Sequence, residues 1–152
     1  MKMVITMELI KPDVYLHNKP LYMHKVLLSI GSNSNACFNM KQATNYVLSY
    51  FPNIKFTSII ETEPHGAIYK DPFLNALAYF ETDMSKEQLL LHLKTIEKEM
   101  GRQAAHKDEG KIIIDIDLAK WNNDVLKPDD FERDYMHMLM LQMQEILDKF
   151  QY

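Results

Sequence analysis

Two aspartates, Asp115 and Asp117, occupy alternate positions of the otherwise apolar segment KIIIDIDL, which covers residues 111–118. The β-branched composition of this segment predicts a strand, on which side chains two apart point to the same face, roughly 6.6 Å apart along the chain. Two carboxylates brought together in this way repel each other and lose hydration unless a cation, a basic side chain or solvent compensates. A magnesium ion shared with the phosphate oxygens of a substrate would satisfy them. The alternative interpretation is a pair of solvated aspartates on an edge strand or at an exposed strand end.

Three other places in the sequence could bind a ligand. Phe73 and Asn75 lie on one face of a predicted strand, and a ring for stacking with an amide for edge hydrogen bonds suits a flat heterocycle, although core packing is the alternative. Arg102 follows a predicted helix, where its guanidinium can hold a phosphate bidentately or complement the helix dipole. Residues 31–33 (GSN) join a strand to a helix, and either present backbone N–H groups to an anion or form a plain turn.

Hydrophobic periodicity and turn residues divide the chain into strands and helices. The second helix begins at a capping signal, Asp83 or Ser85 followed by Gln88, and ends before Gly101. The predicted strands cover residues 25–30, 54–61, 73–82 and 111–118, and the predicted helices cover residues 38–50, 83–100 and 129–150. This order is a split βαβ, or ferredoxin-like, arrangement, so we expect an α+β fold with an antiparallel sheet and helices on one face. Residues 1–23 are expected to be an N-terminal extension, and residues 24–152 a single domain.

The composition excludes several classes of protein. The 152 residues are 47% hydrophobic and 25% charged, which is typical of one globular domain. The single Cys37 cannot form an internal disulfide, and the six scattered histidines match no structural zinc pattern. A net charge of −4 argues against a surface for generic nucleic-acid binding, so any phosphate site must be local. The sequence has no membrane-spanning apolar stretch and no signal-peptide pattern, and a cytoplasmic location is expected.

Five short segments carry a family resemblance when read in order. They are GSN (31–33), TEPHG (62–66), FLN (73–75), IEKEMGR (96–102) and DIDL (115–118). Together they resemble the 6-hydroxymethyl-7,8-dihydropterin pyrophosphokinase family of folate biosynthesis, over about residues 26–125. That family transfers pyrophosphate from ATP to the hydroxymethyl group of a dihydropterin and releases AMP, with two magnesium ions between the nucleotide and a pair of aspartates.

The resemblance implies roles for several residues. Asp115 and Asp117 would hold two Mg²⁺ ions, and they would form the catalytic group together with Arg102. The dihydropterin would stack between Phe73 and a second aromatic or apolar side chain. Three further positions, Asn75, Thr62 and Pro64, would bind the edge of the pterin. Glu97, Arg102 and Lys111 would line the ATP side. The partners implied are thus two small molecules, with neither nucleic acid nor membrane.

The chain also departs from the family pattern. Ala104 and Ile112 stand where the family typically carries basic residues, and Tyr135 stands where it carries a histidine that contacts the nucleotide phosphates. Lys111, His106 and Lys107 are the candidates to replace the missing cations, although a lysine lacks the planar fork of arginine. The alternative function is therefore a weakened relative that binds a pterin, a nucleotide or a protein partner without efficient turnover.

Overall fold

The computed structural model describes residues 15–16, 19–20 and 23–150. Before residue 23 it contains one short antiparallel pair, β1 (Tyr15–Leu16) with β2 (Lys19–Pro20). Most of the predicted extension, residues 1–23, lies outside the described residues, so its separation from the domain stays a prediction. In the described ranges, no helix is long and apolar enough to cross a bilayer.

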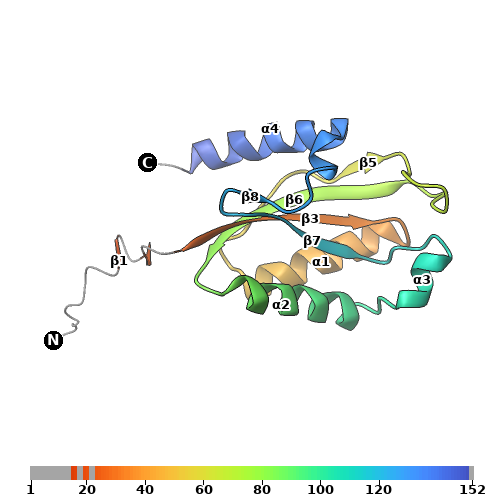
Figure 1. Cartoon of the computed structure of the whole chain (residues 1–152), viewed down its shortest axis with the longest axis horizontal. Coiled ribbons are helices and arrows are strands. Elements are labelled where there is room, and N and C mark those ends of the chain that lie inside the picture. The colour runs from red at the N-terminus through yellow and green to blue at the C-terminus, as the bar shows by residue number, and fades with distance from the viewer. Residues whose placement is uncertain (1–14, 17–18, 21–22, 151–152) are drawn as a thin grey trace.

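A single antiparallel sheet organises the rest of the chain (Figure 1). The elements in order are β3 (His24–Ser32), α1 (Ala36–Tyr50), β4 (Lys55–Phe56), β5 (Ile60–Thr62), β6 (Phe73–Thr82), α2 (Lys86–Glu99), α3 (Ala104–Asp108), β7 (Asp115–Trp121), β8 (Asp124–Val125), a 3₁₀ turn (Asp130–Glu132) and α4 (Asp134–Lys149). The strand order is β4-β6-β3-β7-β8, and β5 also pairs with β6. With β3 central between β6 and β7, this is the predicted α+β, ferredoxin-like arrangement.

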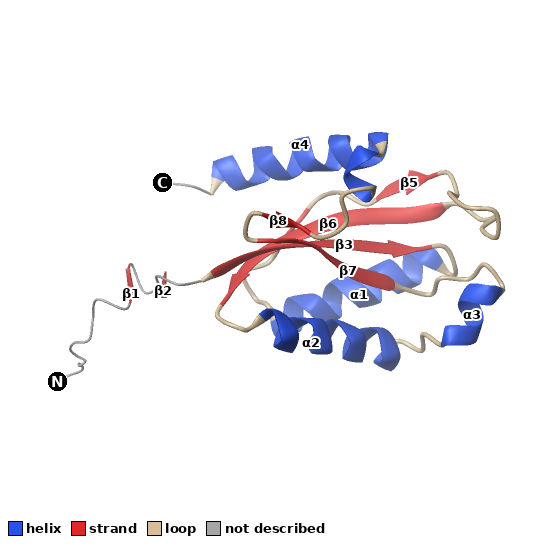
Figure 2. Cartoon of the chain, in the orientation of Figure 1, coloured by secondary structure: helices blue, strands red, loops and turns tan. Residues whose placement is uncertain are grey.

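Helices cover both faces of the sheet, and the expectation of helices on one face was wrong (Figure 2). Helices α1 and α2 pack on one face, over the even-numbered residues of β3 and β6. Helix α4 packs on the other face, over odd-numbered residues such as Leu27 and Leu77, through its buried Met136, Leu139 and Met143. The reason is visible in β6, which is apolar on both of its faces and therefore needs cover on each.

The strand predicted for residues 54–61 is divided into β4 and β5. At the break, the Oγ1 atom of Thr57 accepts a hydrogen bond from the backbone N–H of Leu77 at 2.9 Å. The backbone N–H of Ser58 then donates to Oε1 of Gln142 in α4 at 2.6 Å. Because side chains take these backbone partners, the strand ladder is interrupted, and the second half of the strand is tied to α4.

Helix α2 begins and ends at the predicted signals. Ser85 Oγ accepts the N–H of Gln88 at 3.1 Å, and the N–H of Ser85 donates to Gln88 Oε1 at 3.0 Å, which forms a capping box. At the other end Gly101 has φ 96°, and the backbone N–H of Arg102 donates to the carbonyl of Glu97 at 3.1 Å. This Schellman-type turn directs Arg102 back toward the residues of α2.

Asn33 fixes the segment that precedes β7. Its side chain accepts the N–H of Ile112 at 2.7 Å and donates to the carbonyl of Gly110 at 2.9 Å. Its own backbone N–H donates to the carbonyl of Ile112 at 3.0 Å. Residues 110–112 are thus bound by a buried side chain, and β7 begins at Asp115 rather than at the predicted residue 111. The turn after β3 is a clamp, and the N–H of Asn33 is not available to an anion.

We predict that Asn33→Ala lowers the free energy of unfolding by about 2 kcal/mol, because a buried N–H and a buried carbonyl lose their partners. Chemical denaturation of the two proteins measures this difference. The control is Asn53→Ala, which removes an exposed amide from the turn after α1 and should change stability by less than about 0.5 kcal/mol. Equal effects of the two substitutions would contradict the clamp.

Candidate active site

The register of three strands brings the predicted site residues onto one face of the sheet. Gly31 in β3 pairs with Asn75 in β6 on one side and with Asp115 in β7 on the other. Ser29, the next residue on this face, pairs with Asp117. Adjacent strands lie about 4.8 Å apart, so the amide and the first carboxylate stand about 10 Å apart across a glycine. Because Gly31 and Ser29 are small, no large side chain of β3 covers the sheet surface between Asn75 and the two aspartates. We call this part of the sheet surface the floor of the site.

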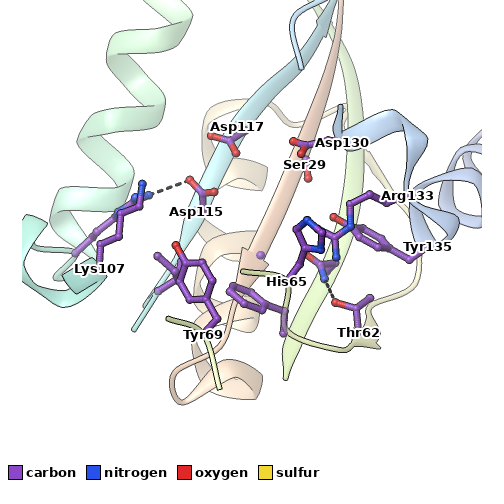
Figure 3. A pocket seen from close by; sticks show the side chains of 15 residues that line it. Ser29, Thr62, His65, Tyr69, Lys107, Asp115, Asp117, Asp130, Arg133 and Tyr135 are labelled. Atoms are coloured by element: carbon purple, nitrogen blue, oxygen red, sulfur yellow. Dashed lines mark hydrogen bonds and ion pairs between the residues drawn. The ribbon is translucent and has the colours of Figure 1, made fainter. Parts of the chain in front are cut away.

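A cavity of about 200 Å³ lies over this floor (Figure 3). Its walls come from the loop before β6, from α3, and from the 3₁₀ turn and first residues of α4. The lining residues are Ser29, Gly31, Thr62, His65, Tyr69, Phe73, Asn75, Arg102, Lys107, Ile112, Asp115, Asp117, Asp130, Arg133 and Tyr135. The cavity therefore opens beside the N-terminal end of α4, on the α4 face of the sheet.

Arg102 connects the first aspartate to the buried end of α2. Its Nη1 atom lies 2.9 Å from Asp115 Oδ1 and 3.1 Å from both Glu97 Oε2 and the carbonyl oxygen of Ile114. Glu97 Oε2 also accepts the N–H of Ile116 at 2.7 Å. Burial alone would lower the pKa of Arg102, but the hydrogen bond to Asp115 and the negative charge of Glu97 outweigh it and raise that pKa.

Glu97 itself is buried, and it lies behind the cavity rather than in its lining. Burial raises the pKa of Glu97, while the hydrogen bond from Ile116 and the charge of Arg102 act in the opposite direction. Glu97 therefore fixes the position of Arg102 and of strand β7. It thus contacts the cavity only through Arg102 and strand β7.

Asp117 carries the strongest electrostatic cost in the site. Burial, the charge of Asp115 and a hydrogen bond with Asp115 raise the pKa of Asp117 from 3.8 to about 7. Lys127 Nζ lies 3.7 Å from Asp117 Oδ2, and its positive charge only partly offsets this rise in pKa. A cation that binds between the two carboxylates would relieve their repulsion.

The donor set fits a hard divalent cation. Asp115 and Asp117 supply carboxylate oxygens from one face, which Mg²⁺ prefers over nitrogen or sulfur. The described residues contain no cluster of three or more histidine, cysteine, aspartate or glutamate side chains that could hold a metal ion alone. Mg²⁺ commonly takes one or two carboxylates and completes its octahedron with water and phosphate oxygens, so two carboxylates are sufficient.

The predicted pterin residues gather on the other side of the floor. Asn75 is buried, and its Nδ2 donates to Thr62 Oγ1 at 2.7 Å. The rings of Phe73 and Tyr69 form a T-shaped contact, with centroids 5.4 Å apart and planes at 79°. Pro64, which the resemblance also placed here, is half-buried and is not among the described residues that line the cavity.

Of the three candidate replacement cations, Lys107 lines the cavity. Lys111 is exposed, pairs with Glu109 at 3.7 Å and lies outside the lining. His106 Nδ1 accepts the backbone N–H of Gln103 at 3.3 Å, which caps α3. The structure thus places Lys107, rather than Lys111, in the lining of the cavity that Asp115 and Asp117 share.

The sequence interpretation missed several lining residues. Ser29 could have been found, because it stands two residues before Gly31 on the same face of a predicted strand. Nothing local in the sequence marks the other four, His65, Asp130, Arg133 and Tyr69, because loops and the packing of α4 bring them to the cavity.

Comparison with known proteins identifies related sequences. The sequence model of the family described as 7,8-dihydro-6-hydroxymethylpterin-pyrophosphokinase matches residues 27–145. The folate synthesis bifunctional protein of Arabidopsis thaliana is 33% identical over 96 residues, which cover 62% of this chain and 20% of that protein. The 2-amino-4-hydroxy-6-hydroxymethyldihydropteridine pyrophosphokinases of Haemophilus influenzae and Aquifex aeolicus are 27% and 28% identical, over 66% and 69% of this chain. The chain spans 64% and 66% of those two proteins, slightly less than two thirds of their length.

We predict that Asp117→Asn stabilises the metal-free protein at pH 8. A pKa of about 7 in the folded state against 3.8 means that the folded state binds more protons between these pH values, so wild-type stability falls as pH rises from about 4 to 7. A shift of one pKa unit corresponds to ~1.4 kcal/mol of unfolding free energy. Because the Asp117 side chain is 26% exposed, solvent screens part of this effect, and we expect Asp117→Asn to raise the free energy of unfolding by about 1–3 kcal/mol.

Denaturation in the presence of EDTA at pH 8 and at pH 4 measures this effect. The gain should be largest at pH 8 and should shrink toward pH 4. Asp124→Asn, in the exposed strand β8, is the control and should leave stability nearly unchanged. A loss of stability on Asp117→Asn at pH 8 would show that the carboxylate is not under strain.

Proposed function

Because the chain belongs to the 7,8-dihydro-6-hydroxymethylpterin-pyrophosphokinase family, we propose that it transfers pyrophosphate from ATP to the hydroxymethyl group of 6-hydroxymethyl-7,8-dihydropterin, a step of folate biosynthesis. One observation carries this proposal: the paired carboxylates of Asp115 and Asp117 and the Asn75–Thr62 amide–hydroxyl pair face the same small cavity from opposite sides of Gly31. A metal-binding pair and a site for a heterocycle thus share one floor. The cytoplasmic location expected from the sequence remains part of the proposal.

The carboxylates would hold two Mg²⁺ ions. Bound there, magnesium would neutralise the polyphosphate and polarise the phosphorus that is attacked. Arg102 would keep Asp115 in place through its Nη1 contact, which leaves the rest of the guanidinium on the cavity side. Glu97 would act through Arg102 and the N–H of Ile116, as a positioning residue.

The dihydropterin would bind on the Asn75 side. The amide of Asn75, oriented by its 2.7 Å hydrogen bond to Thr62, would pair with the edge of the heterocycle. Phe73, whose ring makes a T-shaped contact with Tyr69, would offer an aromatic surface for stacking. The backbone near Pro64 would complete the edge contacts. The hydroxymethyl group would then point across Gly31 toward Asp115 and Asp117.

This arrangement suits pyrophosphoryl transfer. The hydroxymethyl oxygen attacks the β-phosphorus of ATP, the bond from that phosphorus to the oxygen bridging the α-phosphate breaks, and AMP leaves. The hydroxyl proton is released. Such a reaction depends on in-line positioning and on neutralising charge more than on a covalent catalyst.

We predict magnesium-dependent formation of AMP from ATP and the dihydropterin. Asp115→Asn and Asp117→Asn should each lower kcat by about 100-fold or more, because each removes a charged ligand of the metal. Chromatographic measurement of AMP checks this, with Asp124→Asn as a control that keeps wild-type activity. If pure, folded protein formed no AMP above background, the chain would instead be a relative that binds without turnover.

We further predict that Gly31→Ala weakens binding of the dihydropterin. A Cβ atom at this position would lie 2.8 Å from Oδ1 of Asn75, so the amide must move and its bond to Thr62 is lost. Loss of one oriented hydrogen-bonding group corresponds to roughly a tenfold rise in Kd. Calorimetric titration of the pterin measures it. Affinity for the magnesium complex of α,β-methylene-ATP, measured in the same variant, should stay unchanged, and an equal loss for both ligands would contradict the assignment.

A further inference from the structure

The charges that line the cavity are not all balanced within the protein. Three carboxylates, those of Asp115, Asp117 and Asp130, and three cations contribute to the lining. Of the cations, Arg102 is bound to Glu97 and Asp115. Lys107 and Arg133 have no carboxylate within 4.0 Å in the described part of the chain. Two cations that face a cavity without an anionic partner indicate an anionic ligand.

Lys107 reaches the cavity from α3. It stands three residues after Ala104, and residues three apart on a helix lie on the same side, one turn along. Ala104 is the position at which the family pattern expects a cation, so Lys107 presents a positive charge from the same side of the same short helix. The backbone N–H of Gly110 donates to the carbonyl of Lys107 at 3.0 Å, which ties the end of α3 to the segment held by Asn33.

Arg133 reaches the cavity from the opposite wall, between the 3₁₀ turn and α4 (Figure 3). Its guanidinium carbon lies 4.8 Å from the centroid of the Tyr135 ring, in a cation–π contact. Burial raises the pKa of Tyr135, so the phenol stays neutral at working pH. This contact uses none of the N–H donors of the guanidinium in a hydrogen bond to the ring, so they remain available for an anion.

Tyr135 stands at the position where the family carries a phosphate-binding histidine. From the sequence alone, this replacement removes a phosphate-binding side chain. In the structure, however, the Tyr135 ring contacts the guanidinium of Arg133. The aspartates would bind their side of the polyphosphate through magnesium. The remaining phosphate oxygens then need positive charge from the cavity walls. Among the described lining residues, Lys107 and Arg133 are the cations that form no ion pair.

We propose that Lys107 and Arg133 bind the polyphosphate of ATP from opposite walls of the cavity, and that Tyr135 is a positioning residue for Arg133. The inference rests on the proposed function for its choice of ligand. It assigns to this chain two phosphate-binding cations at positions other than the missing ones, Ala104 and Ile112.

The first test measures affinity for two magnesium-bound probes, inorganic tripolyphosphate and α,β-methylene-ATP, by calorimetry. Lys107→Met and Arg133→Met should each raise Kd about tenfold or more, because each removes a charge-assisted hydrogen bond to phosphate. The double variant should lose about the product of the two factors, since the residues lie on different elements. Each loss should shrink at high salt. Lys41→Met, an exposed lysine on α1 outside the cavity, is the matched control and should bind as wild type does.

The second test addresses Tyr135. Tyr135→Phe keeps the ring and should keep wild-type affinity for tripolyphosphate, whereas Tyr135→Leu should weaken it severalfold. In the Arg133→Met background Tyr135→Leu should have no further effect, because its only action is on the arginine. Thermal denaturation of every variant shows that it is folded. Dihydropterin affinity, which a general disruption of the cavity would lower, should not change in Lys107→Met or Arg133→Met.

The outcomes separate this inference from the proposed function. Wild-type affinity for both probes in Lys107→Met and Arg133→Met, or no binding of tripolyphosphate by the wild type, would overturn the inference even if AMP is formed. Weakened probe binding in the variants would support it even if the wild type forms no AMP, in which case only the proposed reaction fails. If Tyr135→Leu lowered the affinity for tripolyphosphate as much in the Arg133→Met background as in the wild type, the positioning role of Tyr135 would be overturned.

Discussion

The antiparallel register of β3 between β6 and β7 is the constraint on which the site depends. Because side chains alternate between the two faces of a strand, the register that buries Val26, Leu28 and Ile30 under α1 and α2 places Gly31 on the other face. The same register sets Asp115 on one side of this glycine and Asn75 on the other. A shift of one residue in any of the three strands would send a site residue into the core.

Contacts elsewhere in the molecule stabilise this register, which brings two negatively charged side chains close together. Two carboxylates side by side destabilise the metal-free fold, as the raised pKa of Asp117 shows. Hydrophobic packing on both faces, the Glu97–Arg102–Asp115 contacts and the clamp formed by Asn33 offset this cost. The strained pair is expected where a binding site needs charge that a ligand will neutralise.

Much of this could be predicted from local sequence signals. Strand β6 has the predicted bounds, the capping box at Ser85 is present, and the paired aspartates of the DID segment share a face as their spacing required. The predictions that were wrong concern features that depend on tertiary packing. The sequence does not show which face α4 covers, and the strand predicted for residues 54–61 is interrupted by side chains that bond to β6 and α4. The cavity-facing position of Arg133 follows from the packing of α4, so no sequence pattern marked it, whereas Lys107 was one of three candidate cations among which the sequence did not decide.

In the proposed reaction, Asp115 and Asp117 jointly hold the metal that binds the polyphosphate. The most direct test is a crystal grown with Mn²⁺ in place of magnesium, α,β-methylene-ATP and the dihydropterin, with anomalous scattering used to locate the metal. We expect anomalous peaks coordinated by carboxylate oxygens of both aspartates and by oxygens of the phosphates. An ordered nucleotide and pterin in the cavity, with no metal at the two aspartates or with the metal held elsewhere, would contradict it.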